Sequence, residues 1–168
     1  MIFFPNGPAS GPSELRIATP GEMRDLGREL AGLLRAGDVV ILTGPLGAGK
    51  TTLVQGIGEG LGVRGPVTSP TFVIARVHPA LAGPGPSLVH ADAYRLGSVD
   101  EVDDLDLDAD VASAVTVVEW GEGLAEGLAS DRLEISIRPD PDSDVRTVQL
   151  TGYGARWNGA LTGSGDRL

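Results

Sequence analysis

The sequence predicts an α/β fold in which a buried strand leads through a glycine-rich loop into a helix. Residues 38–43 form a short, nearly continuous apolar run, which is typical of a strand buried in a parallel sheet. Glycine fills three of the next six positions, 44–49, and apolar residues then recur at helical spacing over 53–61. A second continuous apolar run, at 114–119, predicts another buried strand. Strand, loop and helix therefore follow one another in the order of an α/β unit.

Residues 44–52 read Gly-Pro-Leu-Gly-Ala-Gly-Lys-Thr-Thr, a full match to the G-x-x-x-x-G-K-[ST] pattern of a phosphate-binding loop (P-loop). The glycines let the backbone bend so that its N–H groups face phosphate oxygens, and the following helix adds its N-terminal dipole. Lys50 is the only lysine of the chain, and it stands where a compact cation reaches the β- and γ-phosphates. The hydroxyl of Thr51 is placed to ligate Mg²⁺. We therefore expect the nucleotide to contact Pro45, Leu46, Gly47, Ala48, Gly49, Lys50, Thr51 and Thr52.

The segment before the loop predicts an edge strand and one helix. Residues 14–18 fit the edge strand. Thr19 is expected to cap the helix, with Pro20 at its first position and Glu22 completing a capping box. Gly37 is the expected end of this helix, which delivers the chain into the buried strand.

The segment after the P-loop helix is rich in hydroxyl groups. Residues 65–72 combine two prolines with three serine or threonine residues, which excludes a helix there. In a P-loop protein, such a segment soon after the first helix is where a switch would sense the γ-phosphate, through hydroxyls such as those of Ser69 and Thr71. A plain Ser/Thr/Pro turn fits the same residues equally well, so both interpretations stay open.

Two carboxylates compete for a role beside the loop. Asp92 stands near the end of a predicted strand at 87–93, where a carboxylate is more often a metal or water ligand than a plain surface acid. Glu119 ends the apolar run 114–119, which is the pattern of the metal-side strand that partners a P-loop. Local sequence does not decide which of the two ligates the metal.

The remaining segments predict a strand at 72–78, two short helices and a hairpin. The acid-rich stretch 100–110 lacks the glycine and the glutamate that an EF-hand loop needs, so a solvated short helix and turn is the better interpretation. A second short helix fits 123–129. Two alternating runs, 132–138 and 145–151, predict the strands of the hairpin.

Composition indicates one domain, expected at 14–153, between a flexible leader (1–13) and a flexible tail (154–168). The chain has no cysteine, which excludes disulfides and thiolate metal sites. No apolar run approaches the ~20 residues of a membrane span, and the N-terminus lacks the basic region of a signal peptide, so we expect a cytoplasmic protein. The net charge of −10 argues against direct, nonspecific binding to nucleic acid, so we expect any role in RNA chemistry to pass through a protein partner. An acid excess that only aids solubility is an alternative, and the two interpretations are compatible.

Four motifs carry a resemblance to a known family. They are the loop at 44–52, Val-Thr-Ser-Pro-Thr-Phe at 67–72, His-Ala-Asp-Ala-Tyr-Arg-Leu at 90–96 and Val-Val-Glu-Trp at 117–120. In this order they resemble the small bacterial ATPases of tRNA threonylcarbamoyladenosine (t6A) biosynthesis, known as TsaE or YjeE. The P-loop alone indicates only a superfamily, whereas the second and third motifs together are specific. Over residues 15–152 the resemblance implies a P-loop NTPase fold: a mostly parallel central sheet with antiparallel strands and helices on both faces.

The resemblance also implies the ligands and the roles of single residues. ATP or ADP would bind with Mg²⁺, which Thr51 and Glu119 would ligate, while Lys50 holds the phosphates. Asp92 would serve hydrolysis near the attacking water, and the segment from Ser69 to Thr71 would be the switch. Two more residues would lie near the nucleotide: Thr19 and Arg146.

The family works with two partner proteins, TsaB and TsaD. TsaD transfers threonylcarbamoyl to adenosine 37 of tRNAs that read codons beginning with A, and the ATPase is needed for the complex to turn over. The resemblance therefore implies that this chain meets tRNA only indirectly.

The sequence also bears on three alternative functions. Guanine recognition by N-K-x-D is excluded, because the only lysine lies in the loop and the only asparagines are Asn6 and Asn158. A small-molecule kinase would need arginines clustered over the phosphates, whereas the arginines here are scattered. A third alternative is a nucleotide-dependent assembly switch whose hydrolysis only times partner release. In that case a non-hydrolysable ATP analogue would support one round of modification but not many.

Overall fold

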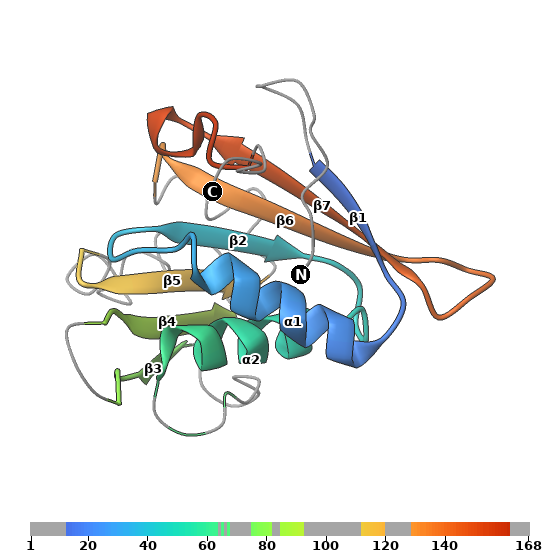
Figure 1. Cartoon of the computed structure of the whole chain (residues 1–168), viewed down its shortest axis with the longest axis horizontal. Helices are drawn as coiled ribbons and strands as arrows, with labels where there is room; N and C mark the ends of the chain where they lie inside the picture. The colour runs from blue at the N-terminus through green and yellow to red at the C-terminus, as the bar shows by residue number, and fades with distance from the viewer. Residues whose placement is uncertain are drawn as a thin grey trace, which may run out of the picture.

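The computed structural model describes residues 13–63, 65, 67, 75–81, 85–92, 112–119 and 129–161. All strands of the described part join one seven-stranded sheet, in the order β1-β7-β6-β2-β5-β4-β3 (Figure 1). In chain order the elements are β1 (Ser13–Ile17), α1 (Pro20–Ala31), β2 (Val39–Thr43), α2 (Lys50–Leu61), β3 (Ala75–His78), β4 (Ser87–Asp92), β5 (Ala114–Glu119), β6 (Arg132–Pro139), β7 (Arg146–Tyr153) and the 3-10 helix η3 (Ala155–Trp157).

The centre of the sheet is parallel and its outer strands are antiparallel. β2 lies between β5 and β6 and is parallel to both, and β4 is parallel to β5. On one side β3 joins β4, and on the other β7 joins β6 and β1 joins β7, all of them antiparallel. The predicted α/β fold, its two buried strands and its C-terminal hairpin are confirmed. The carboxyl ends of the parallel strands consequently meet at one edge of the sheet.

Helices α1 and α2 pack side by side on one face of the sheet (Figure 1). Alternate residues of the central strands, such as Val40 of β2 and Val117 of β5, are buried beneath them in a single apolar core. Neither described helix combines the length and the apolar character that a membrane span requires. The short helices predicted at 100–110 and from residue 123 fall outside the described residues, so helices on the second face stay a prediction.

The N-terminal cap of α1 follows the sequence, but its end does not. The Thr19 hydroxyl accepts a hydrogen bond from the N–H of Glu22 at 3.1 Å, as predicted. The Glu22 carboxylate accepts one from the N–H of Ala18 at 2.7 Å, one residue before the N-cap position that a capping box uses. The predicted end at Gly37 is wrong, because α1 ends at its C-cap Gly32, whose N–H still bonds the last turn. Gly37 has φ +94° in the turn that enters β2, so its presence reflects that turn rather than a helix end.

Glycines let the two helices approach each other closely. A Cβ at Gly56 of α2 would lie 2.1 Å from the carbonyl oxygen of Arg24 in α1, which no real contact allows. A Cβ at Gly27 of α1 would lie 2.4 Å from the carbonyl oxygen of Leu53. Glycine lowers the intrinsic helix propensity of α2 by about 1 kcal/mol per residue. The tertiary contact explains why the glycines are nevertheless there.

The flexible tail predicted at 154–168 is wrong for its first half. η3 follows β7 directly, and the side chains of Trp157 and Leu161 are buried with the core. Arg156 donates two hydrogen bonds to the carboxylate of Asp38, at 2.8 and 2.9 Å. This pair ties the segment to the residue that precedes β2. The rest of the tail and almost all of the predicted leader lie outside the described residues.

Candidate functional site

The described site residues gather at the edge where the carboxyl ends of the parallel strands meet (Figure 1). β2 ends at Thr43 and continues into the P-loop, β5 ends at Glu119, and β4 ends at Asp92. In the register of the sheet, Glu119 pairs with Leu42 on one side and with Asp92 on the other. Ligands of open α/β sheets bind at this edge.

The two competing carboxylates lie at different distances from the loop. β5 is hydrogen-bonded directly to β2, so Glu119 is one strand away, about 5 Å in the direction of the hydrogen bonds. Asp92 is one strand farther, at about 10 Å. Glu119 is only 3% exposed, whereas Asp92 is half-buried. This geometry favours Glu119 as the carboxylate on the metal side and Asp92 as the one that water reaches.

The P-loop connects β2 to α2 through backbone that favours glycine. Gly47 has φ +78° and Gly49 has φ +109°, both in the left-handed region. Gly49 is the N-cap of α2, and no side chain caps the helix there. The N–H groups of the first helical turn therefore point out of the helix without an intrahelical acceptor. Ala48 is buried and anchors the loop, while Leu46 at its tip is 94% exposed.

Lys50, the first residue of α2, directs its ammonium group back over the loop. Its Nζ donates hydrogen bonds to the carbonyl oxygens of Gly44, at 2.5 Å, and Pro45, at 3.1 Å. Burial lowers the pKa of Lys50 from its ordinary value of 10.5, and the negative charges of Glu119 and Asp92 oppose that shift. This buried cation thus lies within the field of both carboxylates.

The start of α1 and the start of β7 reach the same edge. The Met23 side chain lies 3.4 Å from where a Cβ of Gly49 would be, so the first turns of α1 pack on the loop. Thr19 caps this helix. The end of β1 pairs with Arg146 at the start of β7, and the Arg146 guanidinium donates to the carbonyl oxygen of Asp144 in its own hairpin. Contact of Thr19 and Arg146 with a nucleotide stays a prediction.

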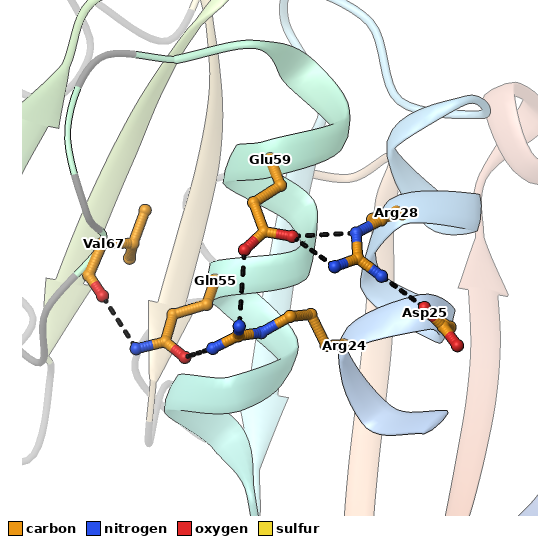
Figure 2. Close-up of polar contacts among 6 residues, drawn as sticks. All are labelled: Arg24, Asp25, Arg28, Gln55, Glu59 and Val67. Atoms are coloured by element: carbon orange, nitrogen blue, oxygen red, sulfur yellow. Dashed lines mark hydrogen bonds and ion pairs between the residues drawn. The ribbon is translucent and has the colours of Figure 1, made fainter. Parts of the chain in front are cut away.

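Ser69 and Thr71 lie outside the described residues, but the chain just before them is anchored. Gln55 of α2 donates from Nε2 to the carbonyl oxygen of Val67 at 3.1 Å, and its Oε1 accepts from Arg24 of α1 at 2.7 Å (Figure 2). Gln55 therefore bridges α1 and the approach to the predicted switch. The surrounding pairs of Glu59 with Arg24 and Arg28 are largely exposed, and exposed pairs contribute about 1 kcal/mol or less.

The sequence alone does not predict two of these contacts. Nothing in the local pattern marks Gln55, which is simply a polar residue one turn after Thr51. The second contact is between His90 and Glu119, whose Nε2 and Oε1 atoms are 3.3 Å apart. The alternation of His90 with Asp92 along β4 is a signal for it, because the sheet register puts that face beside Glu119.

Comparisons with known proteins show the family and the fold. Residues 17–148 match the family described as "Threonylcarbamoyl adenosine biosynthesis protein TsaE". The chain is 64% identical over 139 residues to the tRNA threonylcarbamoyladenosine biosynthesis protein TsaE of Streptomyces coelicolor, covering 80% of this chain and 93% of that protein. Its identity to the protein of the same name from Mycobacterium tuberculosis is 52% over 127 residues, covering 72% and 76%. The crystal structure of Bacillus subtilis YdiB superposes with a TM-score of 0.70 at 31% identity, covering 89% of this chain and 91% of that one.

Proposed function

The chain belongs to the TsaE family of threonylcarbamoyl adenosine biosynthesis proteins, and we propose that it is an Mg²⁺-dependent ATPase that lets the partner proteins TsaB and TsaD turn over. Its role in tRNA t6A biosynthesis follows from the family. The observation that carries the proposed ATPase activity is the placement of Lys50, Glu119 and Asp92 around a loop that opens a helix.

The loop fits a phosphate group. A Cβ at Gly47 would meet no atom within 4 Å, so the space beside this part of the loop is open. The helix that follows has no side-chain cap, and its N–H groups and dipole favour an anion. Lys50 donates hydrogen bonds to two carbonyl oxygens of its own loop. When a nucleotide binds, a phosphate oxygen would take the place of these oxygens as the acceptor.

The oxygen donors beside the loop fit Mg²⁺. The described residues hold no cluster of three or more histidine, cysteine, aspartate or glutamate side chains that could bind a metal by itself. Mg²⁺ commonly takes one or two protein oxygens and completes its shell with phosphates and water. Thr51 and Glu119 would supply those two oxygens. When bound, Mg²⁺ neutralises charge on the phosphate oxygens.

The chain's own residues then divide the remaining work. Lys50 would stabilise the negative charge of the β- and γ-phosphates. Asp92, at the end of the strand beyond β5, would accept a hydrogen bond from the attacking water and orient it. The hydroxyls of Ser69 and Thr71 would hold the switch segment against the γ-phosphate. Thr19 and Arg146 would contact the nucleotide from the neighbouring elements.

Nucleotide displacement tests the binding step. Displacement of a fluorescent ADP should be stronger with ATP than with GTP, since the chain cannot form the N-K-x-D motif. Lys50→Ala should weaken ATP binding by more than about tenfold, because hydrogen bonds to charged groups contribute about 1.5–3 kcal/mol. The fold should survive, since the loop glycines and β2 remain. Equal displacement by GTP and ATP would count against the proposal.

Reconstitution with the partners tests the function. Modification of tRNA by TsaB and TsaD, supplied with a threonylcarbamoyl donor, should proceed through many rounds only when this protein and ATP are present. ATP hydrolysis should be slow in the isolated protein and rise when the partners are added. A Ser69→Ala/Thr71→Ala variant should still bind ATP but lose that rise. Full hydrolysis by the protein alone, unchanged by the partners, would contradict the proposed dependence.

A further inference from the structure

One buried histidine beside the site has no role in the proposed reaction. His90 of β4 is fully buried, and neither of its ring nitrogens forms a hydrogen bond within the part of the chain that the structure describes. A buried polar group without a partner costs roughly 1–3 kcal/mol. An apolar residue would avoid this cost, so the ring is expected to make a compensating contact.

The sheet presents one acceptor to this ring. His90 pairs with Val117 in the register of β4 and β5, and Glu119 follows two residues later on the same face. The Nε2 atom of His90 is 3.3 Å from Oε1 of Glu119, and within the described part of the chain that oxygen also accepts no hydrogen bond. Both side chains are almost entirely withdrawn from solvent. The two atoms are neighbours, and a change in the orientation of one side chain is needed to align a hydrogen bond between them.

We propose that His90 is a positioning residue for Glu119: its ring donates the Nε2 hydrogen to Oε1 and so fixes which carboxylate oxygen remains for Mg²⁺. This inference rests on the proposed function, in which Glu119 ligates the metal. Carboxylates that bind metals are oriented by hydrogen bonds from neighbouring groups, and loss of such a partner lowers metal affinity by roughly 10- to 100-fold. His90 acts only through Glu119.

Two substitutions separate this role from simple packing. His90→Leu removes the donor and fills the buried position with an apolar side chain. His90→Gln keeps an N–H donor at a similar reach. The measured quantity is the ratio of ATP affinity with Mg²⁺ to ATP affinity in EDTA, from displacement of a fluorescent ADP. We expect His90→Leu to lower this ratio about 10- to 100-fold while the affinity in EDTA is unchanged, and His90→Gln to retain most of it.

Thr116→Val is the matched control. Thr116 is also fully buried in β5, and its hydroxyl also has no hydrogen-bond partner among the described residues, but it lies on the opposite face of the sheet from Glu119. This variant should leave the Mg²⁺ dependence of ATP binding unchanged. An equal loss in Thr116→Val and His90→Leu would show a general packing effect and overturn the positioning role.

The Glu119→Gln background distinguishes the two possible failures. If Glu119→Gln itself keeps the Mg²⁺ dependence, the metal-binding part of the proposed function fails. If Glu119→Gln loses it but His90→Leu does not, only the positioning role fails. If both hold, His90→Leu should have no further effect on Mg²⁺ dependence when Glu119 is already replaced.

A spectroscopic signature tests the contact without replacing His90. The chain contains only two histidines, so the ring nitrogen signals of ¹⁵N-labelled protein are simple to assign by a His78 variant. The Nε2 atom of His90 should carry a proton, and its signal should move when Mg²⁺ and ATP bind together. An Nε2 atom without a proton, or the same response in Glu119→Gln, would overturn the inference.

Discussion

Lys50 carries a charged group that the fold buries within the candidate site. Its ammonium group is buried against two loop carbonyls, and desolvation lowers its pKa despite the carboxylates nearby. In the unfolded chain the pKa returns to about its ordinary value. Between the two values the unfolded state binds more protons than the folded state, so stability rises with pH in that window.

The first prediction follows from that sign. Replacing Lys50 with Met should raise stability relative to the native protein at neutral pH, and the difference should shrink as pH approaches the ordinary pKa of 10.5. The measurement is urea unfolding of the nucleotide-free protein at a series of pH values. Two parallel curves of unfolding free energy against pH would contradict the prediction. Since Lys50 is the only lysine, no other lysine confuses the comparison.

The second prediction separates Asp92 from Glu119. Because Glu119 stands next to the strand that carries the loop, Glu119→Gln should lose the Mg²⁺-dependent part of ATP affinity. Because Asp92 is one strand farther out, Asp92→Asn should bind Mg²⁺ and ATP nearly normally and lose about 10²-fold or more in hydrolysis rate. Binding titrations and single-turnover hydrolysis measure the two effects. The opposite result would exchange the two roles.

At the scale of elements, the contact between α1 and α2 rests on glycine. Gly56→Ala adds a methyl group that would lie 2.1 Å from a backbone oxygen, so one helix must shift. We expect a loss of about 1–3 kcal/mol in the free energy of unfolding, which outweighs the better helix propensity of alanine.

Gly21→Ala is the control for this third prediction. Gly21 also lies in a helix, but a Cβ there would meet only the Thr19 hydroxyl, at 3.8 Å. The same substitution should therefore stabilise the protein by up to about 1 kcal/mol. Thermal or urea unfolding measures both variants. Equal effects of Gly56→Ala and Gly21→Ala would mean that the helices do not pack as closely as the structure has them.

At the scale of the whole molecule, one ion pair joins distant parts of the chain. Arg156 after β7 bonds Asp38 before β2 and also donates to the carbonyl oxygen of Leu33 at 2.7 Å. Its guanidinium also lies 4.4 Å from the centre of the Trp157 ring. Both partners are largely buried, so removing one leaves a charge without its counterion.

The fourth prediction concerns this pair. Arg156→Leu should cost about 3 kcal/mol of unfolding free energy, the low end for a buried pair, because Asp38 keeps its hydrogen bond from the Arg35 N–H. Arg138→Leu is the control, since Arg138 meets Glu14 at 3.7 Å on the surface, and it should cost about 1 kcal/mol or less. Urea unfolding measures both. A negligible loss in Arg156→Leu would show that the C-terminal segment does not contribute to the fold.

Patterns of residues that are close together in the chain predict much of the fold. The P-loop pattern, the two buried strands β2 and β5 and the Thr19 cap depend on residues that are close in the chain. The end of α1 was predicted at the wrong glycine, because Gly32 and Gly37 give the same local signal and only packing and the entry into β2 distinguish them. The glycines and polar residues after β7 predict a flexible tail, because a single tryptophan among them gives no periodic apolar signal. Trp157 is nevertheless buried.

Periodicity tells which face a side chain occupies but not which strand lies beside it. The sequence alone predicted that Asp92 stands near the end of one strand, that Glu119 ends another, and that a loop with the P-loop pattern precedes a helix. That Glu119 stands next to the loop, that His90 touches it, that Gln55 reaches Val67 and that Gly56 meets α1 came only from the folded chain. These contacts join residues that are far apart in sequence. They depend on the order of the strands and on the packing of the helices, which the local sequence does not determine.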